Sequence, residues 1–96
     1  MELHEQLEHV TNQESFLAFA SALAQNRASA IQAEAKNPAS PYSADAGGWE
    51  NTSIESFLNA AVAWAEGSNF GATQGLASAN PWRKFAVFLY CGKIYE

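Results

Sequence analysis

The sequence predicts an all-α fold, a small bundle of three main helices with a short helix at its N-terminus. A helix-start pattern, Thr-x-x-Glu-Ser-Phe-Leu, occurs twice, at residues 11–17 and 52–58. A third start stands at Asn80-Pro81, because asparagine is a strong cap and proline loses no hydrogen bond at the first helical position. No region alternates polar and apolar residues for long, as a half-buried strand would. Residues 1–96 are therefore expected to form one helical domain.

The N-terminal half is expected to hold a short helix and a long one. Leu3, Leu7 and Val10 are spaced for one face of the short helix. Thr11 then caps the first main helix, and Glu14 reaches back to complete a capping box. This helix is expected from about residue 12 to about residue 35, and the Asn37-Pro38 pair marks its end. Its stripe comprises Phe16, Phe19, Ala20, Leu23, Arg27, Ala30 and Ile31.

A linker and the second main helix follow. Residues 37–50 contain two prolines and a Gly-Gly pair, which oppose regular structure. Trp49 is costly to expose, so we expect it to act as an N-terminal staple or to plug the side of the bundle. The helix itself is expected over residues 53–66, with a capping box from Thr52 to Glu55. Its predicted inner face comprises Ile54, Phe57, Leu58, Ala61 and Ala65, with Trp64 on the flank.

A glycine-containing loop over residues 67–79 leads to the third main helix, and we expect Phe70 and Leu76 to pin it to the core. The helix is expected from Pro81 to about Gly92, and Ile94 and Tyr95 are expected to dock the end of the chain. It is apolar nearly all round, which is typical of a central helix. Its apolar residues are Trp82, Phe85, Ala86, Val87, Phe88, Leu89 and Tyr90.

The repeated pattern has two explanations. Eight of the fourteen positions from Thr11/Thr52 to Ala24/Ala65 are identical. An internal duplication would produce this identity, and so would two capped amphipathic helices under the same constraints. Two units are in either case too few for a solenoid array.

Composition and charge exclude several classes of function. Ten acidic residues against five basic ones give a net charge of −5, and no run of Lys and Arg is present for the phosphate contacts of nucleic-acid binding. The longest uncharged apolar run, residues 85–91, is far short of the roughly twenty residues of a membrane span. Cys91 is the single cysteine, so no internal disulfide can form, and no signal peptide is recognisable. We therefore expect a cytoplasmic protein that binds neither nucleic acid nor membrane.

No arrangement of residues typical of catalysis or metal binding is present. His4 and His9 are five residues apart, whereas the zincin motif places its histidines four apart on one helical face. No serine stands in a nucleophile elbow, and Gly47-Gly48 lacks the lysine of a phosphate loop. Cys91 is expected to be buried and inert. The sequence thus predicts no enzyme, no metal and no cofactor.

Five residues are candidates for an interaction surface. Arg83 and Lys84 occupy the first turn of a helix, where the dipole disfavours cations. We expect an acidic side chain of the domain, an acidic partner protein or a bound anion to offset them. A tryptophan half exposed beside Arg83 would resemble an interface hot spot. The structural alternatives are that the tryptophans belong to the core and that Asn51 is a helix-entry residue. The candidates, which would converge if they form a site, are Trp49, Asn51, Trp82, Arg83 and Tyr95.

A Trp-x-Asn-x-Ser/Thr segment at residues 49–53, a Trp-Arg pair in residues 81–86 and a terminal Tyr95-Glu96 recur together in one known family. With these motifs, and with Glu14-Ser15-Phe16-Leu17, the chain resembles a family of small, mostly bacterial proteins catalogued as domain of unknown function number 7660. Its longer first helix and first loop depart from the family. The resemblance implies a small helical domain and carries no activity, cofactor or site.

The leading hypothesis for function is a non-enzymatic protein-binding module, in one version an immunity- or antitoxin-like inhibitor that masks a basic toxin surface through charge complementarity. One alternative is a self-associating structural protein, because many aromatic and few charged residues leave apolar area for a symmetric dimer to cover. An exposed patch containing Tyr42, Phe70 or Phe88 would favour that alternative. The other is a small-molecule-binding domain, which would need a closed aromatic pocket.

Overall fold

The computed structural model describes residues 2–36 and 46–95. Over these residues it consists of helices and short 3-10 turns without a strand, which confirms the predicted all-α fold. Residues 37–45 of the predicted linker, including Tyr42, lie outside the described residues. The elements are α1 (Leu3–Leu7), α2 (Gln13–Lys36), η1 (Ala46–Gly48), α3 (Ile54–Gly67), η2 (Ala72–Gln74) and α4 (Pro81–Ile94).

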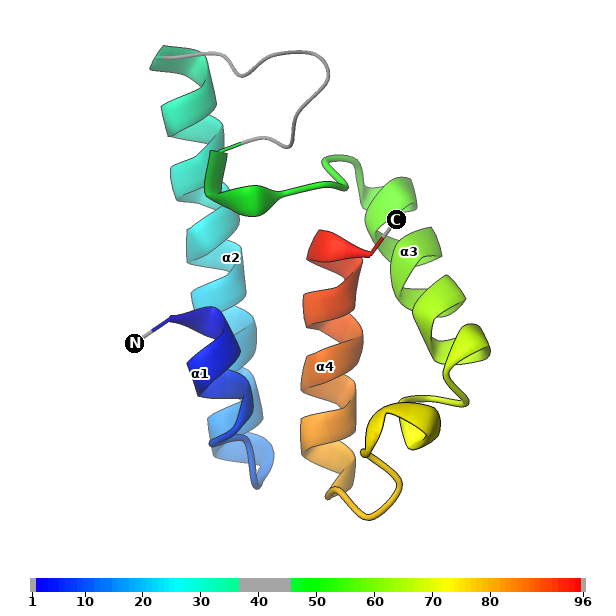
Figure 1. Ribbon diagram of the computed structural model, residues 1–96. Helices are drawn as coiled ribbons and strands as arrows, with labels where there is room; N and C mark the ends of the chain where they lie inside the picture. The colour runs from blue at the N-terminus through cyan, green and yellow to red at the C-terminus, as the bar shows by residue number, and fades with distance from the viewer. Residues whose placement is uncertain (1, 37–45, 96) are drawn as a thin grey trace.

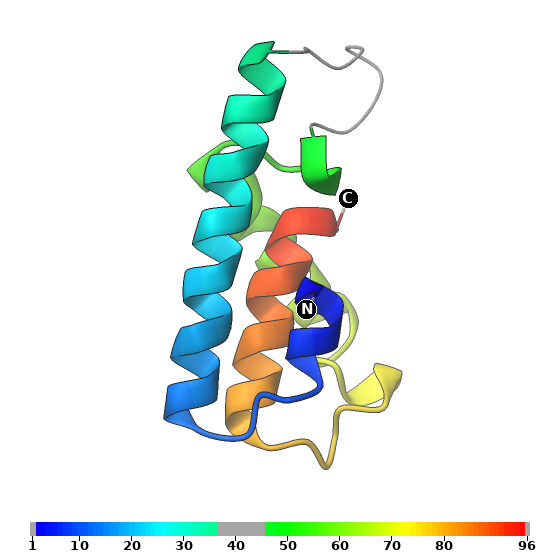
Figure 2. The same ribbon diagram turned by 90° about the vertical axis from the view of Figure 1, so that its left-hand side faces the viewer.

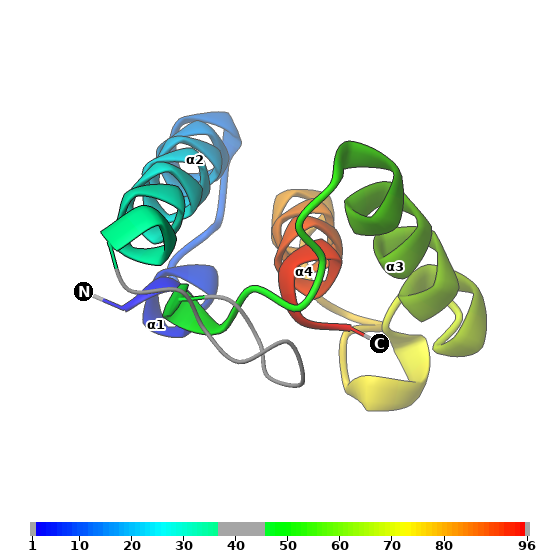
Figure 3. The same ribbon diagram turned by 90° about the horizontal axis from the view of Figure 1, so that it is seen from above.

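Helix α4 is the central helix, as its apolar sequence predicts. It packs against α3, α2 and α1, and Figures 1 and 3 show α2 and α3 on its two sides. Helices α2 and α4 run in the same direction, while α3 runs the opposite way (Figure 1). Helix α1 lies against α2 and α4 (Figure 2). In the described part of the chain α2 and α3 are not packed extensively on each other, so one side of α4 lies between them without a covering helix.

The hydrophobic core lies between α2 and α4, where α1 and the segment after η1 close it. Phe19 and Ala86 are fully buried at its centre. Phe70 and Leu76 hold the loop after α3, since Phe70 stacks on Phe88 at 5.6 Å and Leu76 packs at Gly71. The buried members of the core are Leu7, Val10, Phe19, Leu23, Ala30, Trp49 and Ala86.

Both repeated helix starts are capped one residue later than predicted. The Asn12 side chain accepts from the Ser15 N–H at 2.9 Å, and Ser15 Oγ accepts from the Asn12 N–H at 3.0 Å. Ser53 and Ser56 form the same reciprocal pair at α3. The predicted Thr-to-Glu capping boxes are therefore wrong. Asparagine and serine are stronger caps than threonine, which explains why they take this position.

The Ser53 cap of α3 is expected to contribute to the stability of the protein. Ser53→Ala is expected to lower the free energy of unfolding by about 1 kcal/mol, because it removes the acceptor for the Ser56 N–H at 3.1 Å. Thr52→Ala, the matched control one residue earlier, should leave stability within about 0.5 kcal/mol. Urea unfolding of both variants measures the difference, and an equal loss in the two would show that Ser53 is not the cap.

The buried face of α3 differs from the predicted one. Ala60, Ala61 and Trp64 are buried, whereas Ile54 and Leu58 lie at the surface. The reason is Trp64, whose ring packs edge-on against Phe70 at 5.7 Å and whose Nε1 donates to Gln74 Oε1 at 2.8 Å. Because the Trp64 indole faces inward with its N–H hydrogen-bonded, the smaller Ile54 and Leu58 side chains face outward. The prediction that Ile54 and Leu58 face the core was wrong.

Two other predicted apolar positions are also exposed, Ile31 on α2 and Phe85 on α4. At the end of the chain, Lys93 is buried and Ile94 is exposed, so the prediction that Ile94 docks this segment was wrong. Helix α4 also continues through Gly92 to Ile94. Gly92 therefore lies inside the helix, and its missing side chain makes room there for the Phe57 ring.

Candidate functional site

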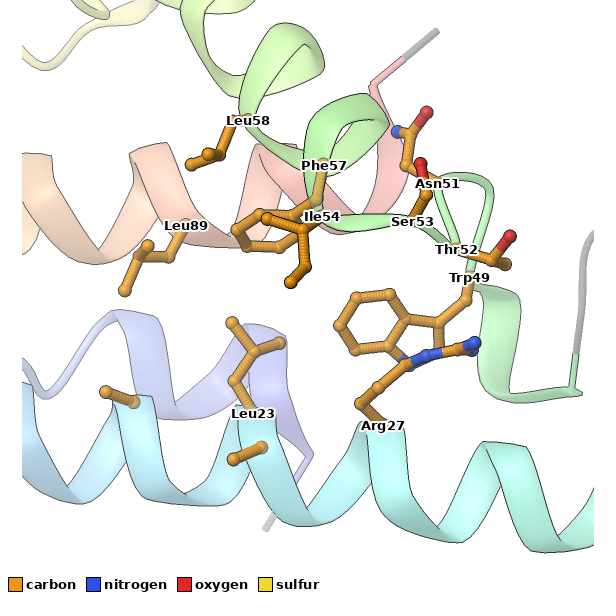
Figure 4. A pocket seen from close by; sticks show the side chains of 12 residues that line it. Leu23, Arg27, Trp49, Asn51, Thr52, Ser53, Ile54, Phe57, Leu58 and Leu89 are labelled. Atoms are coloured by element: carbon orange, nitrogen blue, oxygen red, sulfur yellow. The ribbon is translucent and has the colours of Figure 1, made fainter.

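A groove of about 480 Å³ runs between α2 and α3 over the uncovered side of α4. Ala20, Leu23 and Ala24 of α2 line one wall, Ile54 and Leu58 of α3 line the other, and Leu89 of α4 lies between them (Figure 4). These six side chains are aliphatic, so this part of the groove offers burial and shape rather than hydrogen bonds. The rest of the lining comprises Arg27, Trp49, Asn51, Thr52, Ser53 and Phe57.

The groove belongs to a longer apolar surface. Large side chains that remain exposed follow the lining residues at helical steps: Leu17 precedes Ala20 and Ala24, Val62 follows Leu58, and Phe85 precedes Leu89. Each lies on the same helical stripe as a lining residue. The exposed fractions are 55% for Leu17, 78% for Ile54, 48% for Leu58, 45% for Val62 and 47% for Phe85.

The sequence repeat builds the two walls in the same way. Phe16 packs against Trp82 of α4 at 5.7 Å, and Phe57 packs against Gly92 of the same helix. The leucine that follows each phenylalanine is left outside, Leu17 on α2 and Leu58 on α3. The two repeat units thus flank α4, and each sends its phenylalanine inward and leaves its leucine exposed.

Trp49 closes one end of the groove. Its ring is 4% exposed, stacks on Phe57 at 6.2 Å, and its Nε1 donates to Asn26 Oδ1 at 2.8 Å. The Arg27 guanidinium lies 5.3 Å from the ring centroid, and Lys93 Nζ lies 5.5 Å from it. Figure 4 shows Arg27 beside the indole. Burial lowers the pKa of Lys93, while the charge of Glu2 acts in the opposite direction. Trp49 therefore plugs the bundle, and the indole face attracts both cations.

The five residues predicted for an interaction surface do not converge. Three lie at the end of α4 where Asn51 Nδ2 donates to Gly92 O at 3.0 Å and to Tyr95 O at 2.8 Å. Trp82 and Arg83 lie in the first turn of α4, about 20 Å away along a helix of this length. Trp49 and Asn51 hold the fold together, so the structural alternatives describe them best.

Within residues 2–36 and 46–95, no ion pair offsets the charge of the first turn of α4. Asn80 caps this turn by accepting from the Arg83 N–H at 2.9 Å. Arg83 Nε is buried without a hydrogen-bond partner, and Lys84 Nζ donates to the Ala77 carbonyl at 3.3 Å. No acidic side chain of the described residues pairs with either cation. The half-buried Trp82 stands directly beside Arg83.

Cys91 is buried, and a metal-binding cluster is absent from the described residues. Burial raises the pKa of the Cys91 thiol to about 11, so the nucleophilic thiolate is scarce at neutral pH. Residues 2–36 and 46–95 bring no three His, Cys, Asp or Glu side chains together in a way that could hold a metal ion. Among these residues, no helix has the length and apolar character needed to cross a bilayer.

Sequence reasoning missed the groove because it assigned its residues to the interior. Ile54, Leu58 and Phe85 were each placed on a buried stripe. The sequence did contain a signal of exposed apolar surface. The apolar residues of α3 cover more of the helix than the single face that one neighbouring helix can bury.

Comparison with known proteins identifies a family. The model of a family described as "Family of unknown function (DUF7660)" matches residues 12–96. No curated protein and no solved structure matches the chain.

Proposed function

The chain belongs to the DUF7660 family, for which no function is described, and we propose that it is a non-enzymatic protein-binding module whose groove between α2 and α3 holds an amphipathic helix of a partner protein. The observation that carries this proposal is a set of five large apolar side chains, 45–78% exposed, of which two line the groove and three continue its helical stripes beyond it. Exposed apolar patches of this kind mark interaction sites.

The dimensions of the groove suit a helix. Ile54 to Val62 spans about 12 Å along α3, and Leu17 to Arg27 spans about 15 Å along α2, at about 1.5 Å per residue. A partner would therefore place two to three turns in contact with the groove. Apolar residues at i, i+4 and i+7 are the anchors that this recognition mode uses. The small side chains of Ala20 and Ala24 let a helix backbone approach closely on the α2 side.

The groove fits a small ligand less well. Small-molecule sites bury most of the ligand surface and carry a few placed polar groups. Here the apolar surface extends beyond the pocket to Leu17, Val62 and Phe85, and the polar lining residues Arg27, Asn51, Thr52 and Ser53 lie at the Trp49 end (Figure 4). Within the class of protein-binding modules, an immunity- or antitoxin-like inhibitor of a basic protein is compatible with a net charge of −5.

A peptide titration tests the proposal. The probe is a 16-residue helix with leucines at i, i+4, i+7 and i+11 and a neutral Gln/Ser face, added to 15N-labelled protein. We expect amide shifts along the groove, at Ala24, Leu58 and Leu89, and none on α1. Leu58→Asp should weaken binding at least about tenfold, because a carboxylate would be buried in the apolar contact.

The matched control is Ile94→Asp. Ile94 is 41% exposed against 48% for Leu58, but on α4 it lies about 140° or more around the helix from Phe85 and Leu89. Both variants should keep the melting temperature of the parent protein within a few degrees. Binding that is weakened equally by the two substitutions, or shifts that map away from the groove, would refute the proposal.

A further inference from the structure

We propose that the helix held in the groove is basic, with lysine or arginine along both flanks of its apolar face. This inference rests on the proposed function, since it names the chemistry of the partner for the same groove. It follows from the charges that border the exposed apolar stripes and from the sequence repeat that places them.

On α3 the border is acidic. At 100° per residue, Ile54, Leu58 and Val62 span an arc of 80°, and Glu55 and Glu66 fall within about 40° of Val62 on the side away from the core. Both glutamates are exposed. The sequence of α3 contains no lysine or arginine, so nothing on this helix neutralises them.

On α2 the repeat places Glu14 as it places Glu55. Each glutamate stands three residues before the exposed leucine of its wall, Leu17 or Leu58, and is itself exposed. Carboxylates therefore border the longer apolar surface on both helices, Glu14 near Leu17 on α2 and Glu55 and Glu66 along α3. A helix lying in the groove would have an acidic border along each flank, and lysine or arginine there would complement both.

Three of the five basic residues are engaged by contacts within the fold. Lys84 donates to a backbone carbonyl in the loop before α4, and Lys93 is buried against Trp49. Arg27 lines the Trp49 end of the groove, where its guanidinium lies over the indole ring. No hydrogen bond or ion pair within the described residues engages Glu14, Glu55 or Glu66 through its carboxylate. Their charge remains available to a partner.

A second copy of the chain is a poorer occupant. Reciprocal insertion of α3 into the groove of the other copy would carry Glu55 and Glu66 of each chain into a groove bordered by the same glutamates. Like charges brought together in this way disfavour a pairing. The same borders favour a different protein whose exposed helix is basic.

Two peptides test the inference. They share the leucine stripe of the neutral probe, and one carries lysine and the other glutamate at the positions that flank the stripe. At about 20 mM salt we expect the lysine peptide to bind at least about fivefold tighter, with the difference shrinking at about 0.5 M salt because exposed charges are screened. The double variant Glu55→Gln/Glu66→Gln should remove most of this preference. Glu5→Gln/Glu8→Gln on and after α1 changes the net charge equally and should retain it.

The outcomes separate this inference from the proposed function. Equal binding of the two peptides in the groove, or equal effects of the two double variants, overturns the basic partner and leaves the helix-binding groove intact. If neither peptide nor the neutral probe shifts groove residues, the proposed function falls as well. If sedimentation shows a dimer and Leu58→Asp dissociates it, the groove holds a second copy of the chain. That result would also overturn the inference.

Discussion

Trp49→Ala is expected to lower the free energy of unfolding by about 3–5 kcal/mol, the range for removal of a buried tryptophan. The Trp49 ring is 4% exposed, stacks on Phe57 and donates a 2.8 Å hydrogen bond to Asn26. Its loss would leave a cavity between α2 and α3 and an Asn26 carbonyl without its donor. Lys93 would also lose the indole face, 5.5 Å away, that offsets the burial of its charge.

Two further variants separate these contributions in urea unfolding. Trp49→Phe keeps most of the apolar contact but removes the donor to Asn26, so we expect a smaller loss of about 1–2 kcal/mol. Trp82→Ala removes an indole that is only half buried and should therefore cost less than Trp49→Ala. If the Trp82 and Trp49 truncations were equally costly, Trp49 would not be the plug of the bundle.

Helix positions were predictable because their signals are local. Asn80-Pro81 begins α4 as expected, since a cap and a proline act on the residues beside them. The capping boxes were misplaced by one residue for a related reason. Two adjacent residues at each start, Thr11 with Asn12 and Thr52 with Ser53, can serve as caps, and the choice depends on small differences in capping strength.

The buried faces were less predictable because they depend on distant contacts. Whether Trp64 or Leu58 turns inward depends on Phe70 and Gln74, which lie beyond the end of α3. Lys93 is buried because its ammonium group packs over the ring of Trp49, more than forty residues earlier in the sequence. The spacing of apolar residues within one helix carries no information about contacts with these distant residues. For this reason the sequence pattern placed Ile94, and not Lys93, in the interior.

The groove was unpredictable for a third reason. It exists because α2 and α3 both pack on α4 and not extensively on each other, and this arrangement depends on how close each helix approaches α4. On the α3 side a single residue sets that approach. Gly92 of α4 faces the Phe57 ring so closely that a Cβ atom there would lie 2.8 Å from Cε2 and 2.9 Å from Cζ.

Gly92→Val is accordingly expected to lower the free energy of unfolding by about 3 kcal/mol, at the upper end of the range for overpacking a core. The Phe57 ring cannot move aside easily, since Trp49 stacks on it at 6.2 Å. Gly92→Ala should cost less, because the better helix propensity of alanine offsets part of the clash by up to about 1 kcal/mol.

The matched control is Gly67→Ala in the last turn of α3, where an added Cβ would meet only the Tyr95 hydroxyl at an ordinary 3.7 Å. That substitution should leave stability unchanged or raise it slightly, because it gains helix propensity without a clash. Urea unfolding of the three variants gives the comparison. A Gly92→Ala protein as stable as Gly67→Ala would mean that α3 can move away from α4 without loss. The groove width would then be adjustable, and the helix-binding surface would not depend on a fixed α3–α4 contact.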